Sequence, residues 1–270
     1  GLEIEGGGAA GNVAQGNYIG TDASGMVAAG NDVGVRILDA PWNTIGGEML
    51  AMTGSAPSGF AGMSGNVISG NTSTGVVIIG AGATNNTIQS NMIGTDVFGI
   101  TDLGNGGDGV YIFAGSNNWV GPVSIVPLGV IVPAGTGNVI SGNGVYGVEI
   151  AVASGNTVRG NMIGTDYSGG AAIANSQGGV RIVSAPGNQV GGPGHGDANI
   201  ISGNMSTGVA ILNAESTGNV VAGNRIGTAS TGMVAIPNDG PGVSLFNAPG
   251  NTIGGTVAGA ICIQSGKGLL

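Results

Sequence analysis

Short stretches in which apolar and variable positions alternate recur along the whole chain, and they predict β-strands. Each stretch follows the pattern Gly-Val-x-Ile or a close variant, at steps of 29–41 residues. A two-residue period places Val and Ile on one face of a strand and the variable residue on the other. No stretch has a sustained 3.6-residue apolar period with helix caps, so we expect an all-β chain. The glycines that begin the copies are Gly1, Gly34, Gly75, Gly109, Gly147, Gly179, Gly208 and Gly242.

A second repeat, Ile-Gly-Thr-Asp, occupies every second interval between these stretches. It occurs at 19–22, 93–96 and 163–166, and as Ile-Gly-Thr-Ala at 226–229. Each copy begins two residues after an Asn, and another Asn follows 14 residues after the first. The other intervals contain Asn-Thr-Ile-Gly-Gly or a variant, and then Asn-x-Ile-Ser-Gly-Asn. Such long-period self-similarity is typical of a solenoid.

Three short strands per turn, with Asn or Gly at each corner, predict a coil wound from parallel sheets. We expect a right-handed parallel β-helix of about seven to eight coils, because nearly all parallel crossovers are right-handed. Stacked coils would bury Val and Ile in one column, and corner asparagines would hydrogen-bond along the axis as an asparagine ladder. We expect residues 1–270 to form a single β-helix domain, cut from a longer array, because both ends lie inside repeats.

The composition agrees with a solenoid and disfavours several classes of function. The 270 residues include 60 Gly; 41% are hydrophobic and 7% are charged, with a net charge of −9. A disordered chain has the opposite balance. Only five Lys and Arg are present, too few to neutralise a run of phosphates, so no nucleic-acid partner is expected. No stretch is long and apolar enough for membrane insertion. Cys262 is the single cysteine, and we expect it to be buried in a strand.

The repeated x-Asn-x-Ile-x-x-Asn and Gly-Val-x-Ile patterns resemble those of right-handed parallel β-helix repeat proteins, the pectin-lyase-like superfamily. They are similar to repeats of periplasmic NosD-type proteins and of large bacterial surface proteins. The resemblance covers nearly the whole chain. It implies a bacterial protein at an extracellular or cell-surface location, with any signal or anchor outside this segment. The superfamily holds lyases, hydrolases, epimerases, esterases and adhesins, so the fold alone does not select an activity.

One row of variable positions on the Gly-Val-x-Ile sheet could carry chemistry. It contains Glu3, Arg36, Val77, Tyr111, Glu149, Arg181, Ala210 and Ser244. Neighbouring strands lie about 4.8 Å apart, so Glu3 should face Arg36, and Glu149 should face Arg181. These pairs are either ordinary decoration of a sheet or part of a polysaccharide groove. For the groove, the catalytic candidates are Arg36, Tyr111, Glu149 and Arg181. In the lyases of the superfamily the comparable face binds acidic sugars.

Two tryptophans offer flat faces on which sugar rings could stack. Trp42 and Trp119 border an Asn of the same kind of strand, two coils apart. Together with Tyr111 they are the binding candidates, because an aromatic ring offers apolar area with a polar edge. The alternative is that both indoles cover the roots of the long insertions.

The aspartates of the Ile-Gly-Thr-Asp bends recur in three copies, at Asp22, Asp96 and Asp166. We expect each to cap its bend through local backbone hydrogen bonds, as Asp commonly does in turns. Paired carboxylates for glycoside hydrolysis are one alternative. Calcium, the one cofactor considered, is another, although it needs six to eight oxygens. The single histidine, His195, lies in a Gly-rich stretch that is similar to a calcium-binding repeat but off by one residue. We expect it in a surface loop.

Four insertions interrupt the second kind of turn, all at one corner of the coil. They lie at 46–65, 121–137, 191–198 and 254–259. The segment 122–135 is unusually apolar, and it either packs against the solenoid or contacts a partner. We expect self-association through this segment or through the open coil ends, whose strand edges invite pairing.

Regular coils with few charges favour an extracellular or cell-surface segment with a structural, adhesive or glycan-binding role. The alternative is a polysaccharide-active lyase, hydrolase or esterase that uses the row on the sheet and flanking insertions. A polysaccharide or cell-surface glycan is the expected partner in either case.

Overall fold

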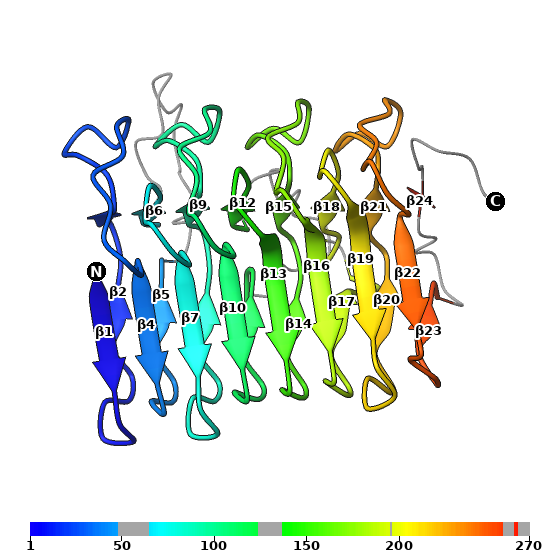
Figure 1. Ribbon diagram of the computed structural model, residues 1–270, viewed down its shortest axis with the longest axis horizontal. Coiled ribbons are helices and arrows are strands. Elements are labelled where there is room, and N and C mark those ends of the chain that lie inside the picture. Colours follow the sequence, from blue (N-terminus) through cyan, green and yellow to red (C-terminus); the bar gives the residue numbers. More distant parts are fainter. Residues whose placement is uncertain (48–64, 124–136, 195, 256–261, 264–270) are drawn as a thin grey trace.

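The computed structural model describes residues 1–47, 65–123, 137–194, 196–255 and 262–263. Within these ranges the chain has no helix, and its strands form three parallel sheets of eight strands each. Consecutive strands enter the three sheets in turn, so each coil adds one strand to each sheet (Figure 1). In Figure 1 the front strands run downward, the chain returns behind them, and the coils advance to the right, which is a right-handed winding. The predicted right-handed parallel β-helix is confirmed.

The three sheets are named in the order in which the chain visits them. Sheet A contains β1 (Leu2–Glu5), β4 (Val35–Leu38), β7 (Val76–Ile79), β10 (Val110–Phe113), β13 (Tyr146–Ala151), β16 (Gly178–Val183), β19 (Thr207–Leu212) and β22 (Val243–Phe246). Sheet B contains β2 (Val13–Ala14), β5 (Thr44–Ile45), β8 (Thr87–Ile88), β11 (Trp119–Val120), β14 (Thr157–Val158), β17 (Gln189–Gly191), β20 (Val220–Ala222) and β23 (Thr252–Ile253). Sheet C contains β3 (Tyr18–Ile19), β6 (Val67–Ile68), β9 (Met92–Ile93), β12 (Val139–Ile140), β15 (Met162–Ile163), β18 (Ile200–Ile201), β21 (Arg225–Ile226) and β24 (Cys262–Ile263).

The Val and Ile of the Gly-Val-x-Ile stretches form the inner column, as expected. Val35, Ile37, Val76 and Ile78 have no exposed surface. The twelve largest side chains that are fully buried are all Ile, a β-branched residue that suits strands. Full burial of such a side chain contributes about 1.5–3 kcal/mol relative to exposure, so the column is the main source of stability.

Asparagines stack at all three corners, which confirms the predicted ladder. They form three columns: Asn12, Asn43, Asn86, Asn118, Asn156, Asn188, Asn219 and Asn251; Asn17, Asn66, Asn91, Asn138, Asn161, Asn199 and Asn224; and Asn31, Asn71, Asn105, Asn143, Asn175, Asn204 and Asn238. In the second column, Asn138 donates from its backbone N and its Nδ2 to Oδ1 of Asn161, at 3.1 and 2.9 Å. Its Nδ2 also donates to the Ile88 carbonyl at 2.8 Å. Each buried amide therefore satisfies the corner backbone as well as its neighbours.

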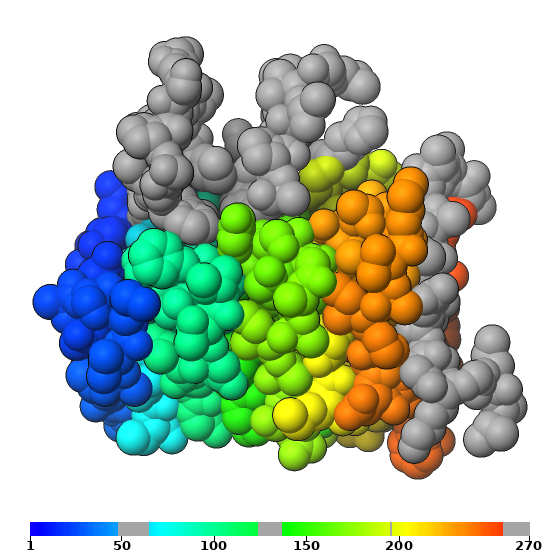
Figure 2. All heavy atoms as spheres, turned by 90° about the horizontal axis from the view of Figure 1, so that it is seen from above, coloured from blue at the N-terminus to red at the C-terminus, as the bar shows by residue number. Residues whose placement is uncertain are grey.

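The Ile-Gly-Thr-Asp segments form hairpins between sheets C and A, and these hairpins cover sheet C. They stack on one another, since Val97 N donates to Gly25 O and Tyr167 N donates to Gly99 O, at 3.0 and 2.9 Å. Figure 2 shows them side by side along the axis, from blue to orange. Gly99 has φ +66°, and a Cβ there would lie 3.0 Å from the sulfur of Met92. The hairpins therefore come close enough to bury a second apolar cluster on the outside of sheet C, formed by Val67, Met92, Val139, Met162 and Ile200.

The described ends of the insertions lie away from sheet A. They follow strands of sheet B and precede strands of sheet C, so all four insertions begin and end at the corner between sheets B and C. The prediction of one shared corner is confirmed. The expectation that they flank the sheet A row is wrong, because the Ile-Gly-Thr-Asp hairpins occupy the corner that leads into sheet A. Residues 124–136, which make up most of the apolar segment 122–135, lie outside the described residues.

Candidate functional site

The predicted row of variable residues forms on the outer face of sheet A. Strand register places Glu3 beside Arg36, Tyr111 beside Glu149, and Glu149 beside Arg181. Arg36 is separated from Tyr111 by Val77 on β7. Three of the four catalytic candidates therefore lie in consecutive coils, and the fourth lies at the N-terminal end of the row.

The two ion pairs of the row differ in burial. Arg36 Nε lies 3.4 Å from Glu3 Oε1, and both side chains are about half exposed. Such exposed pairs contribute about 0–1 kcal/mol, so the first pair is surface decoration. Arg181 Nη1 lies 2.7 Å from Glu149 Oε1, with side-chain exposures of only 28% and 12%. A short charge-assisted bond in a partly buried setting holds both groups in one orientation.

Asp108 and Tyr146 complete a polar cluster around this second pair, and sequence reasoning missed both. Asp108 Oδ1 accepts a hydrogen bond from Tyr146 N at 2.9 Å, and the Arg181 guanidinium lies 5.4 Å from the centre of the Tyr146 ring. The available signal was that each residue stands directly before a repeat glycine, one coil apart. Asp108, Tyr111, Tyr146, Glu149 and Arg181 are called the sheet A cluster below.

Burial within the sheet A cluster favours a proton on Asp108. Burial raises the pKa of Asp108 to about 6; the Tyr146 hydrogen bond lowers it, the Glu149 charge raises it and Arg181 lowers it. The Tyr111 pKa is also raised, first by burial and then by the charges of Glu149 and Asp108. Asp108 can therefore change charge near neutral pH, beside a carboxylate and a guanidinium that are locked together.

A row of apolar side chains runs beside the polar row, also facing outward. It contains Leu38, Ile79, Phe113, Ala151, Val183, Leu212 and Phe246. Phe113 is 38% exposed and Phe246 is 63% exposed. The Tyr111 and Phe113 ring centres lie 6.1 Å apart with the planes tilted by 33°. The cluster thus adjoins the exposed ring of Phe113, which sequence reasoning did not identify.

The two tryptophans lie away from this face. Trp42 precedes Asn43 at the corner between sheets A and B and is 64% exposed. Trp119 is an outward residue of β11 in sheet B, and the Arg159 guanidinium lies 4.3 Å from its ring centre. They are two coils apart, as expected, but they flank their ladder asparagines from opposite sides and do not share a column. A role of either indole in sugar binding remains a prediction.

Arg159 joins Trp119 to the start of the insertion at 121–137 and to the end of the insertion at 191–198. Its Nε donates to Pro122 O at 2.9 Å and its Nη2 donates to Val123 O at 3.0 Å. Its Nη1 lies 3.3 Å from Asp197 Oδ1. Trp119 is therefore tied through Arg159 to the start of the insertion at 121–137, while cover of the insertion roots by both indoles stays a prediction.

The three bend aspartates bind their own hairpins. Oδ1 of Asp22, Asp96 and Asp166 accepts backbone N–H groups two to five residues ahead. Ser24 and Ser168 also donate their hydroxyls to Asp22 and Asp166. In the hairpin at 94–104, Phe98 stands where the other two hairpins have Ser24 and Ser168. Oδ2 of Asp96 is buried without a hydrogen-bond partner. The capping role is as expected from the sequence.

Metal ligation was the weaker alternative for these aspartates. Among the described residues, no group of three or more His, Cys, Asp or Glu side chains lies close enough to hold a metal ion. His195 lies outside the described residues. Cys262 is placed in β24, the strand that pairs with β21.

The fold and its asparagine ladders define a right-handed parallel β-helix repeat protein, the class that the sequence patterns resemble. No family model and no curated protein matches the sequence. Among solved structures, the chain is similar to the A-module of an Azotobacter vinelandii mannuronan C-5 epimerase, with 13% identity and a TM-score of 0.44. The alignment covers 86% of this chain and 54% of the module, so the chain spans about half its length.

A second solved structure is more distant. It is QnrB1, a plasmid-mediated fluoroquinolone resistance protein, with 9% identity and a TM-score of 0.21 over 92% of this chain and 83% of that one. Both TM-scores are too low for either likeness to inform the function.

Proposed function

We propose that this chain binds a polysaccharide along the outer face of sheet A, as a structural or adhesive segment at a bacterial cell surface. The observation that carries the proposal is the sheet A cluster, in which the Tyr111 ring lies next to the exposed Phe113 ring. Aromatic rings offer apolar area to the faces of sugar rings, and fixed carboxylates and guanidinium groups hydrogen-bond to hydroxyls. Polar groups recur along the axis at the strand spacing of about 4.8 Å, which suits an extended, periodic ligand.

The charge of the face favours an uncharged polysaccharide. Above the Asp108 pKa of about 6, the cluster holds two carboxylates and one guanidinium, which leaves one net negative charge. The whole chain has a formal net charge of −9. Like charges at a binding surface disfavour a ligand, so we expect neutral glycans to bind more tightly than polyuronates.

Affinity electrophoresis and calorimetry against neutral and anionic polysaccharides test the proposal. Phe113→Ala and Tyr111→Ala should weaken binding about two- to tenfold each, since an aromatic contact contributes roughly 0.5–1.5 kcal/mol beyond buried area. Tyr167→Ala is a matched control, because Tyr167 is also 38% exposed but lies on a hairpin outside sheet A. Unchanged binding in the two sheet A variants would refute the proposal.

A second candidate function is an enzyme that acts on the same glycan. It is favoured by one observation: the Asp108 carboxyl, which has a pKa of about 6, lies beside the Glu149–Arg181 pair. A proton donor or acceptor with a pKa near the working pH is what general acid–base catalysis needs. Release of new sugar ends or of unsaturated products by the wild type, and its loss in Asp108→Asn with binding retained, would favour the enzyme over the binding segment.

A further inference from the structure

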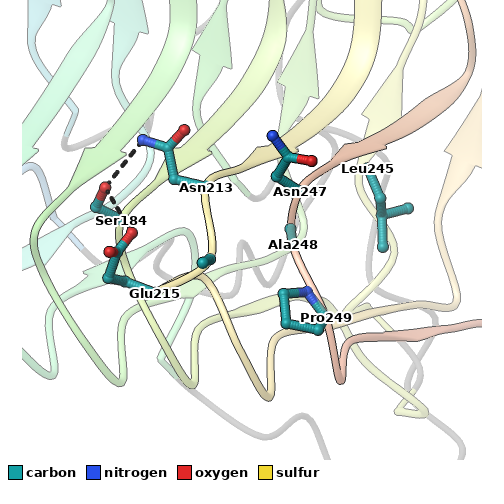
Figure 3. Close-up of a pocket in the computed structure, with 8 residues that line it drawn as sticks. Ser184, Asn213, Glu215, Leu245, Asn247, Ala248 and Pro249 are labelled. Atoms are coloured by element: carbon teal, nitrogen blue, oxygen red, sulfur yellow. Dashed lines mark hydrogen bonds between the residues drawn. The ribbon is translucent and has the colours of Figure 1, made fainter.

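The corner between sheets A and B carries a depression that is separate from the sheet A cluster. It is shallow and wide open to solvent. It lies over the turns that follow β16, β19 and β22 (Figure 3). The lining residues are Ser184, Asn213, Ala214, Glu215, Leu245, Asn247, Ala248 and Pro249.

The depression exists because the middle turn is longer than its neighbours. The turns at 184–187 and 247–250 place four residues before the ladder asparagine, whereas the turn at 213–218 places six. The longer turn is fixed from within: Ser216 Oγ donates to Leu212 O at 2.6 Å and accepts Ala185 N at 3.1 Å. Ser216 is fully buried, so Glu215 beside it is held outward as a ridge.

Polar groups from three coils meet in this depression. Asn213 Nδ2 donates to Ser184 Oγ at 3.0 Å, and the Ser184 hydroxyl in turn donates to Glu215 Oε2 at 3.4 Å. Figure 3 shows the Asn247 amide across a gap from that of Asn213. Ser184, Asn213 and Asn247 have φ values of 48°, 75° and 52°. All three turns therefore begin with a residue in the left-handed backbone conformation, and their first side chains project in register.

Apolar surface borders these polar groups. Pro249 and Ala248 form one wall. Phe246, which immediately precedes Asn247 and faces outward from sheet A, is 63% exposed. The depression thus offers hydrogen-bond donors and acceptors on one side and apolar faces on the other.

We propose that this corner depression is a second saccharide site, which takes a neutral sugar. Amide, hydroxyl and carboxylate groups together match ligands whose hydroxyls both donate and accept, and the apolar wall suits the C–H face of a sugar ring. The Glu215 carboxylate disfavours an anionic ligand. A calcium ion fits poorly, because one carboxylate and two amides supply too few of the six to eight oxygens it takes. The inference takes its class of ligand from the proposed function, but its residues are different.

Saturation-transfer NMR and calorimetry with maltose, cellobiose, lactose and diacetylchitobiose test this site. Glu215→Gln and Asn247→Gly should each weaken the binding of the preferred disaccharide about tenfold, the loss expected for one hydrogen bond to a charged or fixed polar group. Gly keeps the left-handed backbone at 247, so that variant should fold. Ser154→Ala is the control, because Ser154 lies at the same corner in the turn after β13.

The outcomes separate this inference from the proposed function. Loss of disaccharide binding in Glu215→Gln and Asn247→Gly, with Tyr111→Ala unaffected, supports the corner site. Unchanged disaccharide binding in both corner variants overturns it, even if Tyr111→Ala abolishes polysaccharide binding and so supports the proposed function. No binding of any of the four disaccharides by the wild type, or a thermal shift with calcium chloride that Glu215→Gln removes, also overturns it.

Discussion

Replacing Asp108 with Asn should remove a pH dependence of stability that this carboxyl imposes on the fold. Burial raises its pKa in the folded protein to about 6, from an ordinary value of 3.8 that the unfolded chain retains. Because the folded value is the higher one, the folded protein binds the proton more tightly. Asp108 therefore contributes its full stability below pH 3.8, and the contribution is lost as the pH rises through about 6.

The magnitude follows from the difference between the two values. One pKa unit corresponds to about 1.4 kcal/mol, so the ionised Asp108 leaves the fold about 3 kcal/mol less stable above pH 7 than in acid. Asn retains an oxygen that can accept the Tyr146 N–H, and it carries no charge. At about pH 8 the variant should therefore be more stable than the wild type by up to about 3 kcal/mol, or roughly 6–12 °C in Tm.

Urea and thermal unfolding of both proteins, at several pH values from about 4 to about 8, measure this difference. The variant-minus-wild-type free energy of unfolding should rise between about pH 4 and 7 and then level off. Glu5→Gln, which removes an exposed carboxylate from the same sheet, is the control. A difference that does not change with pH would refute the reasoning, because it would mean that Asp108 titrates alike in the folded and unfolded chains.

Three further substitutions test the ladder, the hairpins and the root of an insertion. Asn161→Ala should lower the free energy of unfolding by about 2–4 kcal/mol, because it leaves buried backbone groups without partners, as measured by urea denaturation. Ser168→Ala should lower stability by about 1 kcal/mol, because the Ser168 hydroxyl donates to the Asp166 carboxylate of its own hairpin, as measured by Tm. Arg159→Ala should cost about 1–3 kcal/mol and shift the Trp119 fluorescence to longer wavelength, because the guanidinium no longer covers the indole.

Each of these three has a control and a contradicting result. Asn12→Ala, at an exposed position of a ladder, should cost far less than Asn161→Ala, and equal losses would argue against the cost of burial. Thr231→Ala is the control for Ser168→Ala, because Ala229 replaces the aspartate of that hairpin, and an equal loss of stability in both variants would contradict the hydroxyl argument. Arg225→Ala is the control for Arg159, and the same fluorescence shift in both would rule out a local effect at Trp119.

The fold could be predicted from the sequence because equivalent positions have the same structural role in every coil. Gly-Val-x-Ile and the paired asparagines repeat at spacings that set the strand, the corner and the inward face. Register then follows from the repeat, which is why the facing of Glu149 and Arg181 was predicted correctly. The local capping by the bend aspartates was also predictable, because it depends only on residues within five positions.

The candidate sites could be predicted only in part. The row containing Tyr111, Glu149 and Arg181 follows from the repeat, but the contact between Asp108 and Tyr146 joins residues 38 positions apart. Their approach depends on how the intervening turn folds, and the pKa of Asp108 depends on burial by neighbouring coils. The outward apolar row follows from the same period, but the exposure of Phe113 within it depends on the small neighbouring side chain of Ala151 in the next coil.

The sequence by itself determined the solenoid, its inward column, its ladders and the polar row, since periodic signals specify local conformation and register. Only the tertiary structure decided which irregular parts meet: the hairpins lie on sheet C, the insertions begin and end at the corner away from sheet A, and one longer turn opens a depression at the third corner. The physical reason is that these features depend on the lengths of single turns and on burial by other coils. A repeat pattern does not encode either quantity.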